Sequence, residues 1–498
     1  MEPTLTTTLG ALRGLERGDH LAFLGVPFAE PPIGDRRFTA PEPLDPWTGT
    51  LHAIEFGDAA PQDPFVPASF RATVPESEDC LSLNVYTPAL DGARRPVLFW
   101  IHGGGFSHGS GSQAAYDGGP LTERGDVVVV TINYRVGALG YLYLGGHGGD
   151  AWGAAANIGQ LDQIAALQWV HDNIERFGGD PGNVTIFGQS AGGVAVSTLL
   201  AMPAANVLFH KAIAQSGTAN RLGNTDFASA VTTQYLERLG IPNADPDRLR
   251  SVEIPDLLKA QGPRGPLSPV VDGDSLPQQP LQAVRDGHAA HIALMVGTAR
   301  DEQKLYVAAD RPEIDDAELE RQALVYLPRR AADRAGEVVT LYRESRRSRG
   351  LPATNNDVSD AIATASRFRF PATQLAEAQA AHRPKTYLYQ VDWESPARRG
   401  ALGACHAIEI PFVFGTVGKT GNDRMSGTGP EADRLAEQMM DAWIAFAHTG
   451  EPGHDGIGAW PAYDTTDRRT MIFGRECGAQ SAPFEEERAA WESMVSRP

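Results

Sequence analysis

Several short segments of the chain are apolar at nearly every position. The two clearest are Pro96–Ile101 and Asp126–Ile132. A strand that is apolar on both faces belongs inside a sheet that is covered on both sides, so these segments predict buried, parallel strands. Further short strands are expected at Val184–Phe187, Lys211–Gln215, Ala293–Val296 and Thr386–Gln390.

Helical patterns alternate with these strands. Apolar residues recur at helical spacing over Gln160–Phe177, and the cluster Gly178–Pro181 is expected to break that helix. Small and apolar residues over Ala191–Leu200 predict a buried helix, and a long helix is expected over Glu431–Ala447. The alternation indicates an α/β fold with a central, mostly parallel, twisted sheet flanked by helices.

Residues 310–381 differ in character from the rest of the chain. They are rich in Ala, Glu and Arg at helical spacing and contain few strand formers. We therefore expect a helical cap or subdomain there, inserted into a single catalytic domain that spans residues 1–498.

Composition narrows the class of protein. The chain has 498 residues, 42% of them hydrophobic, which is enough for a large core. It carries 43 basic and 62 acidic residues, a net charge of −19, and its short basic run Arg343–Arg349 is typical of a solvated helix end. No nucleic-acid partner is therefore expected.

The N-terminus and the cysteines bear on location. Three cysteines do not form a disulfide framework, and no Cys-x-x-Cys pair indicates a metal site. The first residues lack the features of a signal peptide, and no apolar run approaches the roughly 18 residues of a membrane span. We expect a cytoplasmic protein without a membrane partner.

One short motif predicts a nucleophile. Gly188–Gly192 matches G-x-S-x-G and lies between a predicted strand and a predicted helix, where a sharp turn would expose Ser190 at the edge of the sheet. A second match, Gly105–Gly109, runs into a loop rich in serine and glycine, so we reject its Ser107 as the nucleophile.

A glycine-rich loop predicts the matching oxyanion hole. The segment His102–Phe106 reads H-G-G-G-F and follows the strand Pro96–Ile101 directly. Backbone N–H groups of Gly104 and Gly105 can face a site without a side chain in the way, and the N–H of Ala191 is a further donor. Such donors stabilise the tetrahedral intermediate of acyl transfer.

These motifs resemble the type-B carboxylesterases, the group of α/β-hydrolases that includes acetylcholinesterase and bacterial p-nitrobenzyl esterases; the latter are the more similar in character. The resemblance covers nearly the whole chain, and its motifs occur in the family's order. It implies an α/β-hydrolase fold and hydrolysis of carboxylic esters. Its motifs are Phe23–Gly34, Ser77–Val85, Asn133–Gly137, Phe187–Gly193, Pro269–Gly273 and Trp460–Tyr463.

The general base is expected late in the chain. In α/β-hydrolases the triad follows the order serine, acid, histidine, which leaves four late histidines open: His382, His406, His448 and His454. The resemblance selects His406, because Leu402–Phe414 is similar to the family's histidine loop.

The acid is expected between the serine and the histidine, in the loop after the strand Ala293–Val296. Residue reasoning alone leaves Asp301 and Glu302 both open, and the resemblance favours Glu302. It also implies a supporting role beside the triad for Ser216, and structural ion pairs of Arg37 with Glu78 and Arg135 with Asp162.

Some positions depart from the family pattern. Position 189 is Gln where many members carry Glu, which weakens any attraction for a cationic substrate. We expect Gln189, like Ser216, to support the triad from beside it. The expected partner site of Cys80 holds Ala, which removes a family disulfide. No aromatic choline site is visible around residues 60–79, and residues 262–268 lack large aromatic side chains that could narrow an acyl pocket.

We therefore expect a broad esterase for small, uncharged ester substrates that acts through an acyl-serine intermediate. No metal or organic cofactor is implied, and a monomer or weak homo-oligomer is expected. The alternatives are an amide or phenylcarbamate hydrolase or an acyltransferase with the same triad. A non-catalytic, cholinesterase-like binding domain is a further alternative that the retained triad disfavours.

Overall fold

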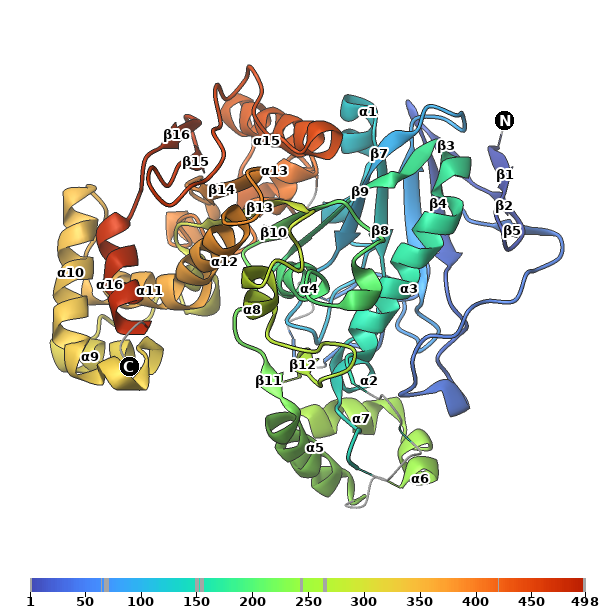
Figure 1. Ribbon diagram of the computed structural model, residues 1–498, viewed down its shortest axis with the longest axis horizontal. Helices are drawn as coiled ribbons and strands as arrows, with labels where there is room; N and C mark the ends of the chain where they lie inside the picture. Colours follow the sequence, from blue (N-terminus) through green and yellow to red (C-terminus); the bar gives the residue numbers. More distant parts are fainter. Residues whose placement is uncertain are drawn as a thin grey trace.

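The computed structural model describes residues 2–63, 65–66, 71–147, 152, 156–241, 245–262, 267–419 and 421–495. Its centre is an 11-stranded sheet in the order β16-β15-β14-β13-β10-β9-β7-β8-β6-β4-β3 (Figure 1). The strands are β3 Leu15–Arg17, β4 His20–Pro27, β6 Ser82–Thr87, β7 Arg95–Ile101, β8 Val128–Ile132, β9 Gly179–Gln189, β10 Lys211–Gln215, β13 Ala293–Ala299, β14 Thr386–Val391, β15 Thr470–Phe473 and β16 Gly478–Gln480.

The middle of the sheet is parallel, as the apolar runs predict. From β8 through β7, β9, β10, β13 and β14 to β15, each neighbouring pair is parallel. Antiparallel strands close both edges, β6, β4 and β3 on one side and β16 on the other. The predicted α/β class is confirmed.

Helices cover both faces of the sheet, which explains the apolar runs. Along β7, Val97, Phe99 and Ile101 join the core with residues of α3 and α4, whereas Leu98 and Trp100 join the opposite core with residues of α15. The flanking helices are α1 Gly119–Gly125, α2 Gly137–Tyr141, α3 Ile158–Asn173, α4 Ala191–Leu199, α8 Pro280–Arg285, α13 Ile410–Val413, α14 Asp423–Ser426 and α15 Pro430–Thr449.

One predicted boundary is wrong. The helix ends before Gly178 as expected, but the strand expected at Val184–Phe187 begins earlier, because β9 starts at Gly179 and runs for 11 residues. Gly179 pairs with Arg95 of β7 before a shift in register that precedes Val97. Helix α3 has already ended at Asn173, and a 3₁₀ turn over Ile174–Phe177 leads to Gly178 in the left-handed region.

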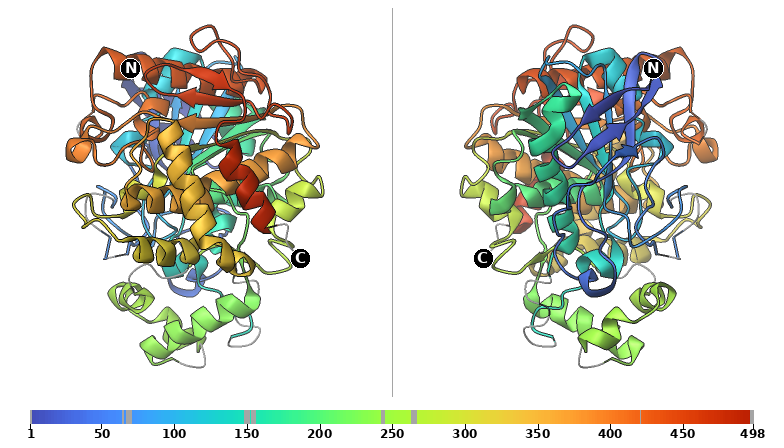
Figure 2. Two further views of the ribbon diagram at one scale, coloured as in Figure 1. Left: turned by 90° about the vertical axis from the view of Figure 1, so that its left-hand side faces the viewer. Right: turned by 90° about the vertical axis from the view of Figure 1, so that its right-hand side faces the viewer.

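Residues 310–381 are largely helical. Helices α9 Asp316–Tyr326, α10 Ala335–Ser348, α11 Asn355–Thr364 and α12 Phe370–Ala380 occupy most of this stretch. The C-terminal helix α16 Glu485–Val495 packs beside α10, and Trp491 and Met494 join its apolar core (Figure 2). The helical layer therefore includes the end of the chain as well as residues 310–381.

Two smaller parts complete the molecule. Helices α5 Thr225–Leu239, α6 Pro246–Arg250 and α7 Ile254–Gln261 lie together at one end (Figures 1 and 2), next to the short strands β11 Gly223–Asn224 and β12 Val270–Val271. Near the N-terminus, β1 Thr4–Thr6, β2 Ala11–Arg13 and β5 Thr50–His52 form a separate small sheet.

Both expected ion pairs form. Arg37 contacts the carboxylate of Glu78 through Nε at 2.6 Å, and Arg135 contacts that of Asp162 through Nη2 at 2.5 Å. All three cysteines are free. Among the described residues, no helix is both long enough and apolar enough to cross a bilayer.

Candidate active site

Ser190 stands on a sharp turn between β9 and α4. Its backbone has φ 59° and ψ −123°, a conformation that L-residues rarely adopt, and its N–H donates to the carbonyl oxygen of Gln215 at 2.8 Å. A Cβ at Gly192 would lie 2.1 Å from the carbonyl oxygen of Ile101. The glycine is therefore required for the close approach of the turn to β7.

The loop His102–Gly105 follows β7 and passes beside the same turn. Gly104 has φ +117°, and a Cβ there would lie 2.0 Å from the carbonyl oxygen of His108. His102 is buried, its ring is stacked on Tyr134, and burial lowers its pKa to about 4. A neutral His102 is thus a fixed structural part of the loop.

Three backbone N–H groups of the glycine loop and of the turn after Ser190 have no acceptor among the described residues. Among the hydrogen bonds between described residues, none is donated by the N–H of Gly104, Gly105 or Ala191. Ala191 is the first residue of α4, where backbone N–H groups are free for an anion and the helix dipole favours negative charge. The arrangement offers donors to an oxyanion formed at Ser190.

His406 and Glu302 form a buried hydrogen bond. The distance between His406 Nδ1 and Glu302 Oε2 is 2.5 Å, and both side chains are almost fully buried. The other oxygen of Glu302 accepts the N–H of Ala299 at 2.7 Å. Because both oxygens of Glu302 are engaged, the carboxylate fixes the orientation of the imidazole ring.

The second nitrogen of His406 contacts Gln189. Gln189 Nε2 lies 3.1 Å from His406 Nε2, so the amide donates to an imidazole whose Nδ1 carries the proton. Ser190 Oγ makes no hydrogen bond to any other described residue. In this structure Gln189, and not Ser190, is the partner of His406 Nε2.

Asp301 lies beside Glu302, but its hydrogen bonds go to Ala404 and Arg300 and not to His406. Its N–H donates to the carbonyl oxygen of Ala404 at 2.8 Å, and its Oδ2 accepts the N–H of Ala404 at 3.2 Å. Gly403, at φ +53°, permits this approach, since a Cβ there would lie 2.7 Å from Asp301 Oδ2. Asp301 therefore joins the loop of Glu302 to the loop of His406.

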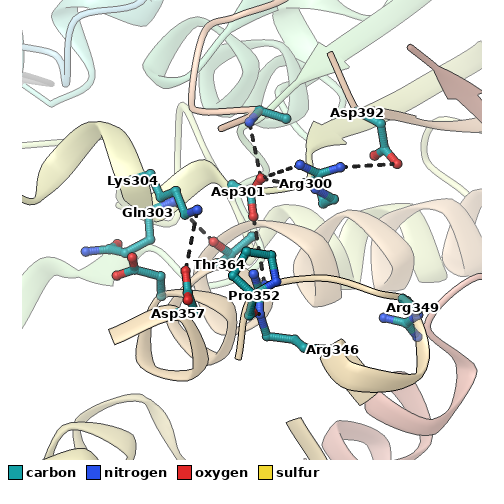
Figure 3. A network of polar contacts seen from close by, with 12 residues as sticks. Arg300, Asp301, Gln303, Lys304, Arg346, Arg349, Pro352, Asp357, Thr364 and Asp392 are labelled. Atoms are coloured by element: carbon teal, nitrogen blue, oxygen red, sulfur yellow. Dashed lines mark hydrogen bonds and ion pairs between the residues drawn. The ribbon is translucent and has the colours of Figure 1, made fainter. Parts of the chain in front are cut away.

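Arginines surround the buried Asp301 carboxylate. Arg300 Nη2 lies 2.9 Å from Oδ2, and Arg346 of α10 lies 3.9 Å from Oδ1 (Figure 3). Burial disfavours the charge, but Arg300, Lys304 and Arg346 outweigh it and lower the pKa of Asp301. Asp301 is therefore a charged, structural neighbour of Glu302.

Glu409, three residues after His406, is a buried carboxylate that the sequence did not single out. It is 1% exposed, and neither carboxylate oxygen has a hydrogen-bond partner among the described residues. Burial, followed by the charge of Glu302, raises the pKa of Glu409 to about 7. Glu409 is thus largely protonated below neutral pH.

Two aromatic rings flank His406, and the sequence did not identify either. The ring centroids of Tyr306 and Phe368 lie 5.3 and 5.1 Å from that of His406. Tyr306 is 38% exposed and belongs to the same loop as Glu302. Phe368 comes from the helical layer, whose contact with the histidine no local pattern could indicate.

The remaining candidates are placed as follows. Ser107 lies in a turn with no helix after it, and its Oγ donates to the carbonyl oxygen of Gly104 at 3.3 Å. Ser216 is buried beside the turn that carries Ser190, but its Oγ has no hydrogen-bond partner among the described residues. The two segments expected to lack aromatic residues, 262–268 and 60–79, fall partly on residues 263–266 and on 64 and 67–70, which lie outside the described residues.

The loops that carry these groups all follow strands of the parallel sheet, at the carboxyl ends of β7, β9, β13 and β14. In open α/β sheets this edge is where substrates bind. A serine on a strained strand-to-helix turn, beside free N–H groups and a buried histidine–carboxylate pair, defines a serine hydrolase with the α/β-hydrolase fold.

Comparison with known proteins defines the family. The model of the carboxylesterase family matches residues 1–491. The chain is 38% identical to the para-nitrobenzyl esterase of Bacillus subtilis (strain 168), over 97% of both chains, and 36% identical to the phenmedipham hydrolase of Pseudarthrobacter oxydans, over 96% of both. A solved PNB esterase structure superimposes with a TM-score of 0.87 at 36% identity and covers 99% of both chains. The chain belongs to the carboxylesterase family and is a carboxylesterase.

Proposed function

We propose that Ser190, His406 and Glu302 form the catalytic triad of this carboxylesterase, and that Gly104, Gly105 and Ala191 form its oxyanion hole. The observation that carries the proposal is the buried 2.5 Å hydrogen bond between His406 Nδ1 and Glu302 Oε2. It keeps the proton on Nδ1, so Nε2 has the free lone pair that a general base needs.

Acylation begins when His406 Nε2 takes the proton of Ser190 Oγ. The oxygen attacks the ester carbonyl carbon, and the carbonyl oxygen becomes an oxyanion that the three backbone N–H groups stabilise. The imidazolium, paired with Glu302, then gives its proton to the leaving alkoxide, so that the alcohol departs and acyl-Ser190 remains.

Deacylation repeats these steps with water. His406 removes a proton from water, the hydroxide attacks the acyl carbon, and Ser190 leaves with the proton returned by His406. Gln189 gives up its contact with Nε2 before either step, because Nε2 has a single lone pair. Its side chain then supports the triad without a charge of its own.

The proposed substrates are uncharged carboxylic esters of broad range. Gln at position 189 adds no carboxylate beside the nucleophile, so the site offers little attraction to a cationic alcohol. Tyr306 and Phe368 give the histidine side of the site an apolar, aromatic surface, which suits uncharged leaving groups.

The test compares initial rates on p-nitrophenyl acetate, butyrate and octanoate for the wild type and Ser190→Ala. We expect Ser190→Ala to lose about 10³-fold or more in kcat, because the acyl-enzyme cannot form. Ser107→Ala, the serine of the other G-x-S-x-G match, is the matched control and should keep its turnover. Full turnover by Ser190→Ala would contradict the proposed nucleophile.

A further inference from the structure

An exposed arginine stands next to the aromatic rings that flank His406. Arg367 belongs to a π-helical turn, Ala365–Arg369, between α11 and α12. Its Cζ lies 5.1 Å from the ring centroid of Tyr306 and 5.3 Å from that of Phe368. The two rings that flank His406 therefore also contact this guanidinium group.

The guanidinium is held in place by uncharged groups. Arg367 Nη1 donates to Gln303 Oε1 at 3.0 Å, and the N–H of Gln303 donates to Thr364 Oγ1 at 3.1 Å. In Figure 3 the amide of Gln303 points away from the Asp301 carboxylate. Two rings and one amide thus fix the orientation of the cation without neutralising it.

Arg367 lacks the kind of carboxylate partner that three other arginines of the helical layer have. In the same helical layer Arg311 pairs with Asp360 at 2.7 Å, Arg346 approaches Asp301, and Arg369 pairs with Glu487. Within the part of the chain that the structure describes, no carboxylate lies at ion-pair distance from Arg367. Arg367 is thus a positively charged side chain beside the candidate active site whose charge no described carboxylate neutralises.

We propose that Arg367 binds a carboxylate on the leaving-alcohol part of the substrate, and that it extends the range of esters from uncharged ones to those with an anionic alcohol. The inference rests on the proposed function, because His406 protonates the leaving oxygen and so places the alcohol beside Tyr306 and Phe368. The planar guanidinium can bind a carboxylate through two parallel N–H groups, which a substrate's aromatic carboxylate matches in geometry.

The experiment uses two acetate esters of similar shape, 4-acetoxybenzoate and 4-acetoxybenzamide, and measures kcat/KM for each with the full-length protein. The ratio of the anionic to the uncharged ester is the readout, and comparing this ratio between variants cancels the different reactivities of the two phenols. Arg367→Gln should lower the ratio roughly fivefold, as expected for a partly solvated, charge-assisted contact. Arg347→Gln removes an exposed arginine of α10 and is the control for net charge.

Three results are decisive. A fall in the ratio for Arg367→Gln alone, which also shrinks as salt is added, supports the proposal. An unchanged ratio in Arg367→Gln, or an equal fall in Arg347→Gln, overturns it, because the effect is then absent or belongs to the overall charge. Loss of both ester activities in Ser190→Ala tests the proposed nucleophile separately, so failure of one hypothesis is distinguishable from failure of the other.

Discussion

Two neighbouring carboxylates at the centre of this molecule have different surroundings. Glu302 meets His406 and a backbone N–H, whereas Asp301 meets arginines and the backbone of Ala404. The backbone of Asp301, at φ −121° and ψ 42°, turns the two side chains to different sides of the loop. Residue types alone could not show which of the two acids pairs with His406, because both follow the same strand and both can pair with a histidine.

Glu409 gives a prediction about pH and stability. Its pKa is about 7 in the folded protein, against about 4.3 for a glutamate in an unfolded chain. Between these values the folded protein holds a proton that the unfolded chain has released, so the free energy of unfolding falls as pH rises, by about 4 kcal/mol in total. Glu409→Gln does not titrate, so it should gain stability relative to the wild type over the same window.

The measurement is urea or thermal unfolding of both proteins at several pH values between about 4 and 8. Glu344→Gln, at an exposed position of α10, is the control and should track the wild type at every pH. A constant difference between Glu409→Gln and the wild type across the window would show that Glu409 titrates normally.

At the scale of elements, the site is made where four loops meet. The sequence predicted the strands before these loops, and with them Ser190 and the glycine loop, because strand, turn and helix signals are local. It did not predict Glu409 or Phe368 as parts of the site. Their importance depends on burial and on contact with distant loops, which a local pattern does not contain.

Asp301 gives a prediction at this scale, because it joins the acid loop to the histidine loop. Asp301→Ala removes the acceptor for the N–H of Ala404, so the two loops can shift relative to each other. A displacement of about 1 Å can cost on the order of 100-fold in rate, so we expect kcat to fall roughly 10- to 100-fold with little change in KM. Steady-state kinetics with active-site titration measures kcat and KM.

Two further variants make this prediction specific. Asp301→Asn keeps an oxygen acceptor for Ala404 and should recover part of the lost kcat. Asp392→Ala removes another carboxylate near Arg300, 3.9 Å away, that has no contact with Ala404, and it should keep most of its kcat. If Asp301→Ala retained the kcat of the wild type, the contact between the loops would be irrelevant to catalysis.

At the scale of the whole molecule, the helical layer connects the end of the chain to the site. We propose that residues 310–381 form a subdomain of one catalytic unit and that α16 completes it. Arg346 of α10 approaches Asp301, and the neighbouring Ser345 donates to Glu487 of α16 at 2.6 Å. Helical spacing predicted that residues 310–381 are helical, but α16 itself was not predicted. The docking of α16 could not be predicted, because its partners lie more than a hundred residues away in the chain.

Glu487 is the charged centre of this docking contact. It is buried, and its carboxylate accepts from Arg349 at 2.9 Å, from Ser345 and from Arg369. Glu487→Gln leaves two arginines without their shared carboxylate, and breaking such a buried pair costs about 3 kcal/mol. We therefore expect a lower unfolding temperature and faster proteolysis within α9, α10 and α16, with a smaller loss of esterase activity. Glu486→Gln, at the exposed neighbouring position, is the control and should leave all three measurements unchanged. If Glu487→Gln were as stable as this control, α16 would be held by its apolar contacts alone.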